Sequence, residues 1–310
     1  MNEATQLRFS DADWEQAGLF DDQLAKQSLD ELFRLTRQYR SSEAYHRLLQ
    51  FVGRFRSYSP FNALLVHIQM PGATYVAPPR RWLRDFQHRI RPGARPLVIL
   101  RPMGPVMFVF DASDTEPQAG ARPLPREVVN PFEVRGGKIG NQLSNTIESA
   151  KRDGVRTSSR DAGTQSAGEI QAKPGGSQDV VVGSVPTPQT VAVPVRYEIL
   201  LNSRHSREAQ YATLAHELGH LYCGHLGTPN PKWWPDRQRF DPGIREFEAE
   251  SVCFLVCRRF GIDNPSDEYL SGYVKDNKEV PPISLEAVMA ASGLIERMGR
   301  QRLKPRKEGH

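Results

Sequence analysis

The sequence predicts an α+β protein with two domains, and three observations support this. Residues 22–57 place apolar side chains at helical spacing, and short apolar runs separated by Gly and Pro follow them up to residue 110. A stretch rich in Pro, Gly, Ala and charge, 113–132, indicates a linker. Beyond it, one apolar strand leads into several helices. We therefore expect a mixed α/β domain over 1–112 and an α-rich domain with a small sheet over 133–310.

The N-terminal domain is expected to contain two helical segments followed by short strands. The first helical pattern covers 22–57. Pro60 suits the first turn of a second helix, which Pro71 and Gly72 end near Met70. The strands expected after it are 75–76, 97–100 and 106–110.

The C-terminal domain is expected to be built around the strand 196–202 and the helix that follows it. Before this strand we expect a helix over 141–153, a loop or irregular hairpin over 156–178, and two pairing strands at 180–182 and 191–193. After it we expect further helices over 244–260, 267–274 and 285–303.

With 38% hydrophobic and 25% charged residues, the chain of 310 residues has the composition of a soluble globular protein. Its apolar stretches, such as 106–110, are far shorter than the roughly 18 residues of a membrane span. The N-terminus is acidic and polar, unlike a signal peptide, and three cysteines are an odd number for a disulfide framework. We expect a cytoplasmic protein without a membrane partner.

Residues 216–220 read His-Glu-Leu-Gly-His and are the most informative part of the chain. On a helix, His216 and His220 lie one turn apart on one face, where two imidazoles can hold one metal ion. Glu217 projects from the adjoining flank, beside the metal rather than bound to it. This spacing is typical of zinc hydrolases, in which zinc acidifies a water molecule and the glutamate accepts its proton. The sequence therefore predicts a Zn2+ site with Glu217 as the catalytic general base.

A catalytic zinc site needs a third protein ligand, and the acidic cluster 246–250 is the expected source. Glu246 and Glu250 share one helix face with Ala249, whose small side chain lets this helix approach the histidines. We assign Glu246 as the ligand and Glu250 as the acceptor of an imidazole N–H. Glu248 is the alternative ligand.

His225 is a second alternative for the third ligand. The extended zinc motif with three histidines places Gly and His three and six positions after the second histidine. Here Gly224 and His225 follow His220 by four and five positions, so the chain does not fit that pattern. We expect His225 in a loop or at the helix end. Candidates for stabilising an oxyanion are Tyr222, His225 and Arg245.

Three stretches of the C-terminal half resemble ImmA/IrrE-type zinc metallopeptidases and the peptidase domain of ArdC-like antirestriction proteins: 197–203, 212–220 and 246–250. Stretches of the N-terminal half are similar to the ArdC N-terminal domain: 58–62, 80–84, 91–96, 99–102 and 108–111. The resemblance implies a gluzincin-like zincin fold, in which two histidines and a downstream glutamate hold zinc. It also implies an N-terminal domain that binds single-stranded DNA. The chain departs from the ArdC pattern at Phe61-Asn62 and in having arginines in place of a lysine-rich turn.

The segment 51–110 contains nine arginines and a single acid, Asp85. A single-strand binder needs cations that follow the phosphates and aromatic rings on which bases stack. The candidate nucleic-acid-binding residues are Arg54, Arg56, Tyr58, Arg80, Arg81, Arg84 and Arg91. Further candidate stacking rings are Phe55, Phe61, Tyr75, Trp82 and Phe86. The alternative for Phe55, Phe61 and Trp82 is that their rings belong to the hydrophobic core and do not stack on bases.

The leading hypothesis is a zinc metallo-endopeptidase that acts on a protein or peptide, with 196–202 as a candidate edge strand for an extended substrate. The alternative hypothesis is an antirestriction protein that binds DNA and whose zinc site is structural. Glu217 discriminates between them, because only hydrolysis requires its carboxylate.

Overall fold

The computed structural model describes residues 39, 41–101, 104–124, 139–161, 168–183, 189–262, 270 and 279–306. Two expected segments, 22–38 and most of 267–274, lie outside these residues. The chain divides into two compact units. Unit 1 consists of 1–38 and 62–133, and unit 2 consists of 39–61 and 134–310. Within the described residues, no helix combines the length and the apolar character needed to cross a membrane.

In unit 1, a helix closes one edge of an antiparallel sheet of strand order β1-β4-β3. The elements are α3 (Pro60–Gln69), β1 (Val76–Ala77), β3 (Leu97–Arg101) and β4 (Gly104–Asp111). The side-chain amide of Asn62 exchanges two hydrogen bonds of 3.0 Å with the backbone of Leu100. Gln69, two turns further along α3, does the same with Val98 at 2.8 and 2.9 Å. The two amides thereby satisfy backbone groups that an edge strand leaves unpaired.

The core of unit 1 forms around Trp82, whose side chain is fully buried against Tyr75 and Phe110. Its indole N–H donates to the Phe110 carbonyl at 2.9 Å, so the buried polar atom is satisfied. The elements around it are α4 (Pro79–Arg81), the π-helical turn η2 (Trp82–Phe86), β2 (His88–Ile90) and β5 (Thr115–Pro117). Because β5 pairs with β2, the first part of the expected linker 113–132 belongs to this unit.

Unit 2 contains a three-stranded sheet of order β6-β10-β7. Its strands are β6 (Val155–Arg160), β7 (Gly168–Ala172) and β10 (Tyr197–Asn202). The expected strand 196–202 is confirmed as β10, but it is the central strand, so the prediction that it offers an edge was wrong. The edge strands of this sheet are β6 and β7. The expectation of a loop or irregular hairpin over 156–178 was also wrong, because the polar strands β6 and β7 are held by pairing with β10.

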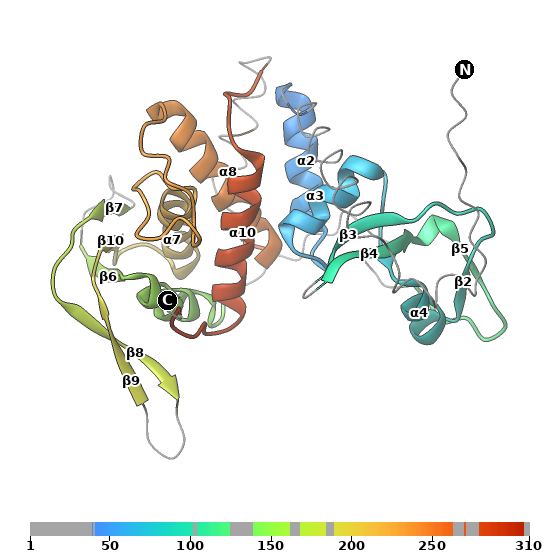
Figure 1. Ribbon diagram of the computed structural model, residues 1–310, viewed down its shortest axis with the longest axis horizontal. Helices are drawn as coiled ribbons and strands as arrows, with labels where there is room; N and C mark the ends of the chain where they lie inside the picture. Colours follow the sequence, from blue (N-terminus) through green and yellow to red (C-terminus); the bar gives the residue numbers. More distant parts are fainter. Residues whose placement is uncertain are drawn as a thin grey trace. The chain divides into compact units, whose positions relative to one another are not determined.

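A second β element of unit 2 is a two-stranded hairpin. It consists of β8 (Ser177–Gly183) and β9 (Gln189–Pro194), and Val180 lies opposite Val191. This confirms the expected pairing of 180–182 with 191–193. The hairpin extends away from the rest of the unit (Figure 1).

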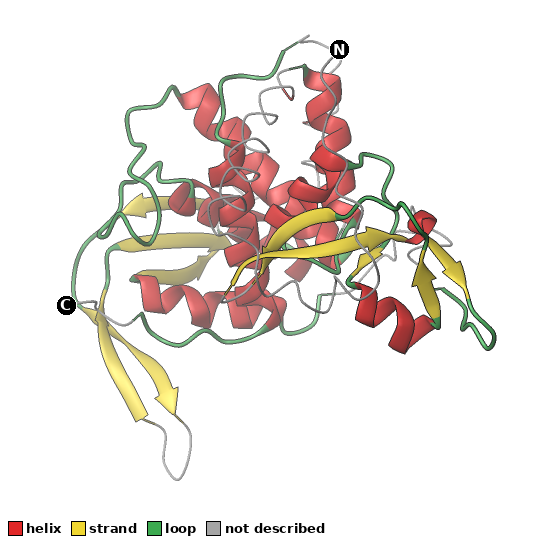
Figure 2. Ribbon diagram, turned by 45° about the vertical axis from the view of Figure 1, so that its right-hand side comes forward, coloured by secondary structure: helices red, strands yellow, loops and turns green. Residues whose placement is uncertain are grey.

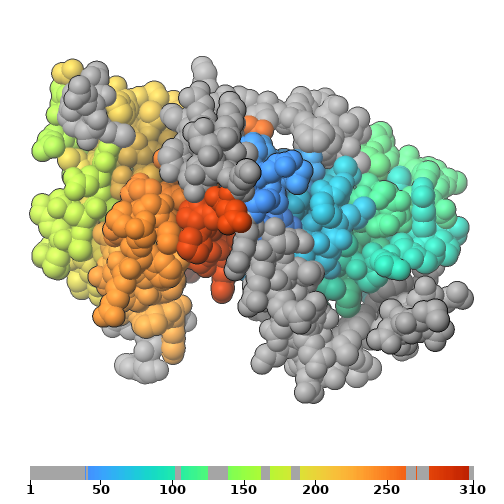
Figure 3. Space-filling model, turned by 90° about the horizontal axis from the view of Figure 1, so that it is seen from above, coloured from blue at the N-terminus to red at the C-terminus, as the bar shows by residue number. Residues whose placement is uncertain are grey.

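The described helices of unit 2 are α2 (Ser42–Arg54), α6 (Gln142–Ala150), α7 (Arg207–Tyr222), α8 (Pro242–Phe260) and α10 (Leu285–Arg300). Helices α6 and α7 pack against the three-stranded sheet, α8 and α10 pack on other helices, and α2 packs on α8 (Figure 1 and Figure 2). Helices were expected at 141–153, 244–260 and 285–303, and all three are present. The surfaces of α8 and α10 adjoin in the space-filling view (Figure 3).

Helix α2 is held in unit 2 by a buried arginine of α8. Arg259 donates to the carbonyl oxygens of Val52 at 2.7 Å and Phe55 at 3.0 Å, and it pairs with Glu296 of α10 at 2.9 Å. The Tyr45 hydroxyl adds a hydrogen bond of 2.9 Å to Ser251 of α8. Segment 39–61 therefore packs with unit 2, although we expected it in the domain 1–112.

Candidate metal centre

Helices α7 and α8 cross closely beneath the His-Glu-Leu-Gly-His motif. A Cβ atom added to Gly219 would lie 3.2 Å from the Ala249 Cα and 3.2 Å from the Val252 Cβ, so the crossing depends on small residues on both helices. The expected role of Ala249, to let α8 approach the histidines, agrees with this geometry. The close crossing brings the acidic first part of α8 up to the histidine face of α7.

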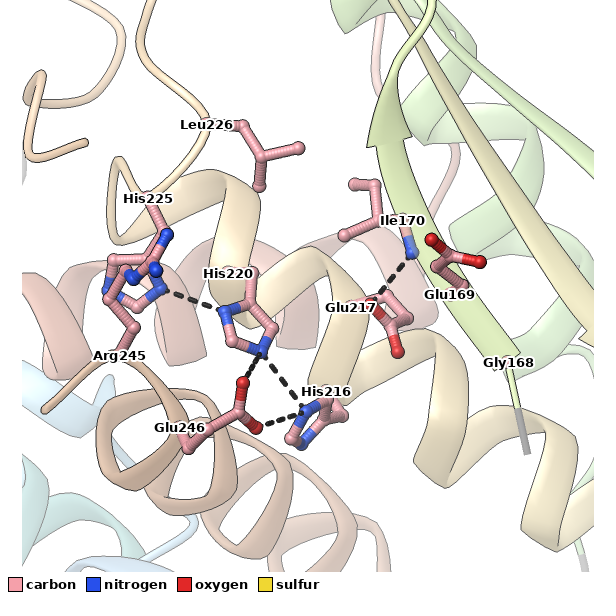
Figure 4. Close-up of a pocket in the computed structure, with 10 residues that line it drawn as sticks. All are labelled: Gly168, Glu169, Ile170, His216, Glu217, His220, His225, Leu226, Arg245 and Glu246. Carbon is pink, nitrogen blue, oxygen red and sulfur yellow. Dashed lines mark hydrogen bonds and ion pairs between the residues drawn. The ribbon is translucent and has the colours of Figure 1, made fainter. Parts of the chain in front are cut away.

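At this crossing, two imidazoles and one carboxylate converge. The Nε2 atoms of His216 and His220 are 3.2 Å apart. The Glu246 carboxylate lies 3.5 Å from His216 Nε2 and 3.4 Å from His220 Nε2 (Figure 4). One ligand atom from each residue lies within 4.8 Å of the others, close enough to hold one ion. We call His216, His220 and Glu246 the metal cluster.

The charges of the metal cluster stabilise one another. Hydrogen bonds with His216 and His220 hold the pKa of the Glu246 carboxyl far below its usual value. Burial alone would lower the pKa of His216, but the contacts with Glu246 and Glu250 raise it to about 9. Glu250 Oε1 lies 3.5 Å from His216 Nδ1, on the side expected for the acceptor of the imidazole N–H.

Glu217 lies on the flank of α7 that faces β7, beside the metal cluster (Figure 4). Its Oε2 accepts a 3.0 Å hydrogen bond from the backbone N–H of Ile170. Burial raises the pKa of this carboxyl, and the nearby histidines act in the opposite direction. A carboxylate held in place with a raised pKa has the properties of a general base.

The two alternative ligands, Glu248 and His225, are engaged elsewhere. Glu248 is fully buried and accepts from both terminal nitrogens of Arg237, at 2.6 and 2.7 Å, and from the Ser284 backbone N–H at 2.7 Å. His225 Nε2 lies 2.9 Å from the same carboxylate, and its Nδ1 lies 3.0 Å from His220 Nδ1. Cys223 completes a buried cluster with these two residues. We call Cys223, His225 and Glu248 the buried cluster.

The protonation of the buried cluster follows from its surroundings. Burial raises the pKa of Glu248, but the hydrogen bonds from His225, Arg237 and Ser284 outweigh it and hold the pKa below its usual value. Burial lowers the pKa of His225. The carboxylate is therefore ionised and the imidazole neutral at physiological pH.

A pocket of about 430 Å3 opens over the metal cluster. Strand β7 lines one side through Gly168, Glu169 and Ile170, and Leu226 and Arg245 lie on the other (Figure 4). Sequence reasoning missed the β7 wall, because polar residues in an expected loop carried no signal for it. Arg245 is half-buried, and its guanidinium makes no hydrogen bond or ion pair within the described part of the chain.

Of the other two oxyanion candidates, neither offers a free donor. The Tyr222 hydroxyl donates to Asp153 at 2.9 Å in the core of unit 2, and Tyr222 does not line the pocket. Both ring nitrogens of His225 lie within hydrogen-bonding distance of a partner. Arg245 is the remaining candidate of the three.

The candidate nucleic-acid-binding residues are divided between the two units. Arg54, Arg56 and Tyr58 belong to unit 2, where Arg56 donates to the Arg258 carbonyl at 2.7 Å and Arg54 lies over the Phe51 ring. In unit 1, Arg81 and Arg84 pair with Asp85, and Arg91 donates to the Thr115 carbonyl. Arg80 is exposed, without an ion pair to any described residue. The rings of Phe55, Tyr75 and Trp82 are buried and cannot stack on bases.

Residues 169–256 match the model of a peptidase family, M78, described as the IrrE N-terminal-like domain. The matched segment runs from β7 into α8, so it includes the metal cluster, Glu217 and the buried cluster. It spans less than a third of the chain. No curated protein and no solved structure matches the chain. We refer to 169–256 as the IrrE-like segment.

Proposed function

We propose that this protein is a zinc-dependent metallo-endopeptidase and that the IrrE-like segment holds its active site. The observation that carries the proposal is the convergence of His216, His220 and Glu246 beside Glu217 at the floor of an open pocket. The similarity of the same segment to a peptidase family supports it. The substrate class is then a protein or a peptide.

The side chains at the pocket floor fit zinc. Two imidazoles and a carboxylate are the ligand set of many catalytic zinc sites, and such sites keep one position open. The Nε2 atoms of both histidines point into the cluster, and the Nδ1 of each has a separate partner, Glu250 or His225. When bound, zinc supplies the acidification of a water molecule and the polarisation of the scissile carbonyl.

Glu217 supplies the proton transfer. Its hydrogen bond to Ile170 leaves Oε1 for a water molecule in the pocket. The carboxylate accepts a proton from that water and passes it to the leaving amine. The pKa of Glu217 is raised toward neutral pH, and a general base works best when its pKa is near the working pH. The shift therefore favours both proton transfers.

The outer edge of β7 is the proposed docking site for the substrate backbone. No described strand pairs with this edge, and Ile170 directs its N–H away from β10 toward Glu217. Strand addition to an exposed edge would hold an extended peptide along the pocket, with its backbone groups hydrogen-bonded to β7. The proposed edge is thus β7 rather than the strand 196–202.

The test compares wild-type protein with Glu217→Gln and with Glu286→Gln, an exposed glutamate in the first turn of α10. Metal content and cleavage of a proteome-derived peptide library are measured for each. We expect about one zinc per chain in all three. Cleavage is expected to fall about 100- to 10,000-fold only in Glu217→Gln.

Zinc-loaded wild type that cleaves no peptide or folded protein would contradict the proposal. If the biological effect of the protein persists in Glu217→Gln with zinc retained, the antirestriction hypothesis with a structural zinc site takes its place.

A second candidate function, binding of single-stranded nucleic acid by unit 1, rests on its exposed arginines. Arg80, Arg95 and Arg101 are exposed, and within the described residues none of them pairs with an acid. Free guanidinium groups bind phosphates, so we propose a mainly electrostatic contact without base stacking.

The test is the affinity for a single-stranded oligonucleotide as a function of salt. The triple variant Arg80→Gln, Arg95→Gln, Arg101→Gln should reduce the slope of log affinity against log salt by about two. The control is Arg47→Gln, whose side chain in unit 2 pairs with Glu43. An unchanged slope in the triple variant would rule out this surface as the binding site.

A further inference from the structure

We infer that His225 is a positioning residue, an inference that rests on the proposed function. His225 links the buried carboxylate of Glu248 to His220 and so selects the nitrogen of His220 that binds the metal. The link runs through two contacts: His220 Nδ1 to His225 Nδ1 at 3.0 Å, and His225 Nε2 to Glu248 Oε2 at 2.9 Å. His225 is 4% exposed and Glu248 is 0% exposed, so water does not compete for either contact.

The direction of each hydrogen bond follows from the carboxylate. Glu248 also accepts from Arg237 and from the Ser284 backbone, and a carboxylate so surrounded by donors is ionised and only accepts. His225 therefore carries a proton on Nε2 and donates it to Glu248. In the neutral ring, Nδ1 is then an acceptor, which requires His220 to donate from its own Nδ1.

This arrangement determines the state of the metal-facing atom. With its proton on Nδ1, His220 keeps a lone pair on Nε2, the atom that lies 3.2 Å from His216 Nε2 and 3.4 Å from Glu246. The opposite tautomer would place a proton between the metal and the ring. The link therefore fixes both the tautomer of His220 and the orientation of its ring.

The anchor of this link comes from parts of the chain that are distant in sequence. Glu248 lies on α8, Arg237 on the loop that follows α7, and Ser284 is the N-cap residue of α10. The carboxylate is fully buried, so it cannot turn away from His225 without losing charged partners. The position of His220 thus depends on the folding of the loop and of α10.

The experiment measures zinc affinity by competition with a chelator of known affinity, so that the readout does not depend on catalysis. His225→Phe removes both hydrogen bonds and should weaken zinc binding about 10- to 100-fold. The control is His46→Phe on α2, where we expect no change. Thermal unfolding of chelator-treated protein shows whether each variant is folded.

Two conservative variants show whether His225 positions His220 or only donates a hydrogen bond to the buried carboxylate of Glu248. His225→Asn places an amide oxygen near the position of Nδ1 and can still accept from His220. His225→Gln places an amide N–H near the position of Nε2 and can still donate to Glu248. We expect the Asn variant to bind zinc within a few-fold of wild type and the Gln variant to bind as weakly as the Phe variant.

The outcomes distinguish failure of this inference from failure of the proposed function. A wild-type protein that binds no zinc would contradict the proposed function itself. If wild type binds zinc and folded His225→Phe binds within twofold of it, only the positioning role is wrong. Rescue by Gln but not by Asn would likewise overturn the role, because it would show that His225 serves Glu248 alone.

Discussion

The metal cluster and the buried cluster contain similar side chains in different surroundings. Both combine histidine with a glutamate of α8, and the two clusters touch through His220 and His225. In the metal cluster, the carboxylate lies against two imidazole nitrogens and faces a pocket. In the buried cluster, a guanidinium and a backbone N–H already bind the carboxylate. Similar residue types can therefore differ in how available their ligand atoms are, because the remaining partners of each atom decide it.

The largest expected effect comes from removing one metal ligand of the proposed site, and the matched comparison removes one side chain of the buried cluster. His216→Ala should reduce the zinc content from about one per chain to near zero, because a single imidazole and a carboxylate remain. Cys223→Ala should leave the zinc content unchanged, because Arg237 and the Ser284 N–H already bind the Glu248 carboxylate beside this thiol. Metal analysis after dialysis measures both. Loss of zinc in folded Cys223→Ala would show that the buried cluster also contributes to zinc binding.

The next effect concerns stability rather than metal binding. Glu248→Gln leaves the Arg237 guanidinium without its carboxylate, and it should lower the free energy of unfolding by about 3 kcal/mol or more. Glu246→Gln on the same helix should change it by less than about 1 kcal/mol, because that side chain is 55% exposed. Urea unfolding of chelator-treated protein gives both values. Equal losses would show that the two carboxylates have the same structural role.

The pH dependence of zinc binding should originate in the metal cluster. In chelator-treated protein, His216 carries a proton below its pKa of about 9, and zinc binds only the unprotonated ring. Zinc affinity should therefore rise about tenfold per pH unit from pH 7 toward 9 and then level off. Calorimetry in buffers of different ionisation enthalpy counts the released protons. A flat affinity over this range would show that His216 is unprotonated before zinc arrives.

The smallest expected effect tests the helix crossing that assembles the metal cluster. Gly219→Ala pushes a methyl group to 3.2 Å from Ala249, which costs about 2 kcal/mol, while the gain in helix propensity offsets about 1 kcal/mol. The net loss of about 1 kcal/mol should be accompanied by weaker zinc binding. Gly72→Ala, with no atom within 4 Å of the added methyl, is the control. Unchanged stability and zinc affinity in Gly219→Ala would mean that the crossing tolerates a wider separation.

Local spacing was sufficient to predict several features of unit 2. His216, Glu217 and His220 lie within one turn and a half of a single helix, so their relative placement follows from helix geometry. The choice of Glu246 over Glu248 rested on the face shared with Ala249, and the structure brings Glu246 to the histidines. Helix α8 and strand β10 were predicted because each carries a strong apolar pattern.

The polar strands and the buried cluster could not be predicted in the same way. Strand β7 reads Gly-Glu-Ile-Gln-Ala, and only its pairing with β10 gives it a structure. The partner of Glu248 is Arg237, which lies in a loop that carries no periodic pattern. His225 was expected in a loop or at the helix end, and the sequence did not indicate that the fold would place it between His220 and Glu248.

The sequence by itself determined the chemical elements of the site: two histidines one turn apart, a glutamate beside them, and an acidic helix to complete the ligand set. The relative placement of the two histidines and the glutamate beside them follows from the geometry of one helix, which the backbone fixes. Only the tertiary structure decided which strand forms the pocket wall. It also decided which buried charge orients His220. Those choices depend on burial and on partners distant along the chain, because a buried charge must be matched wherever the fold brings a counter-charge.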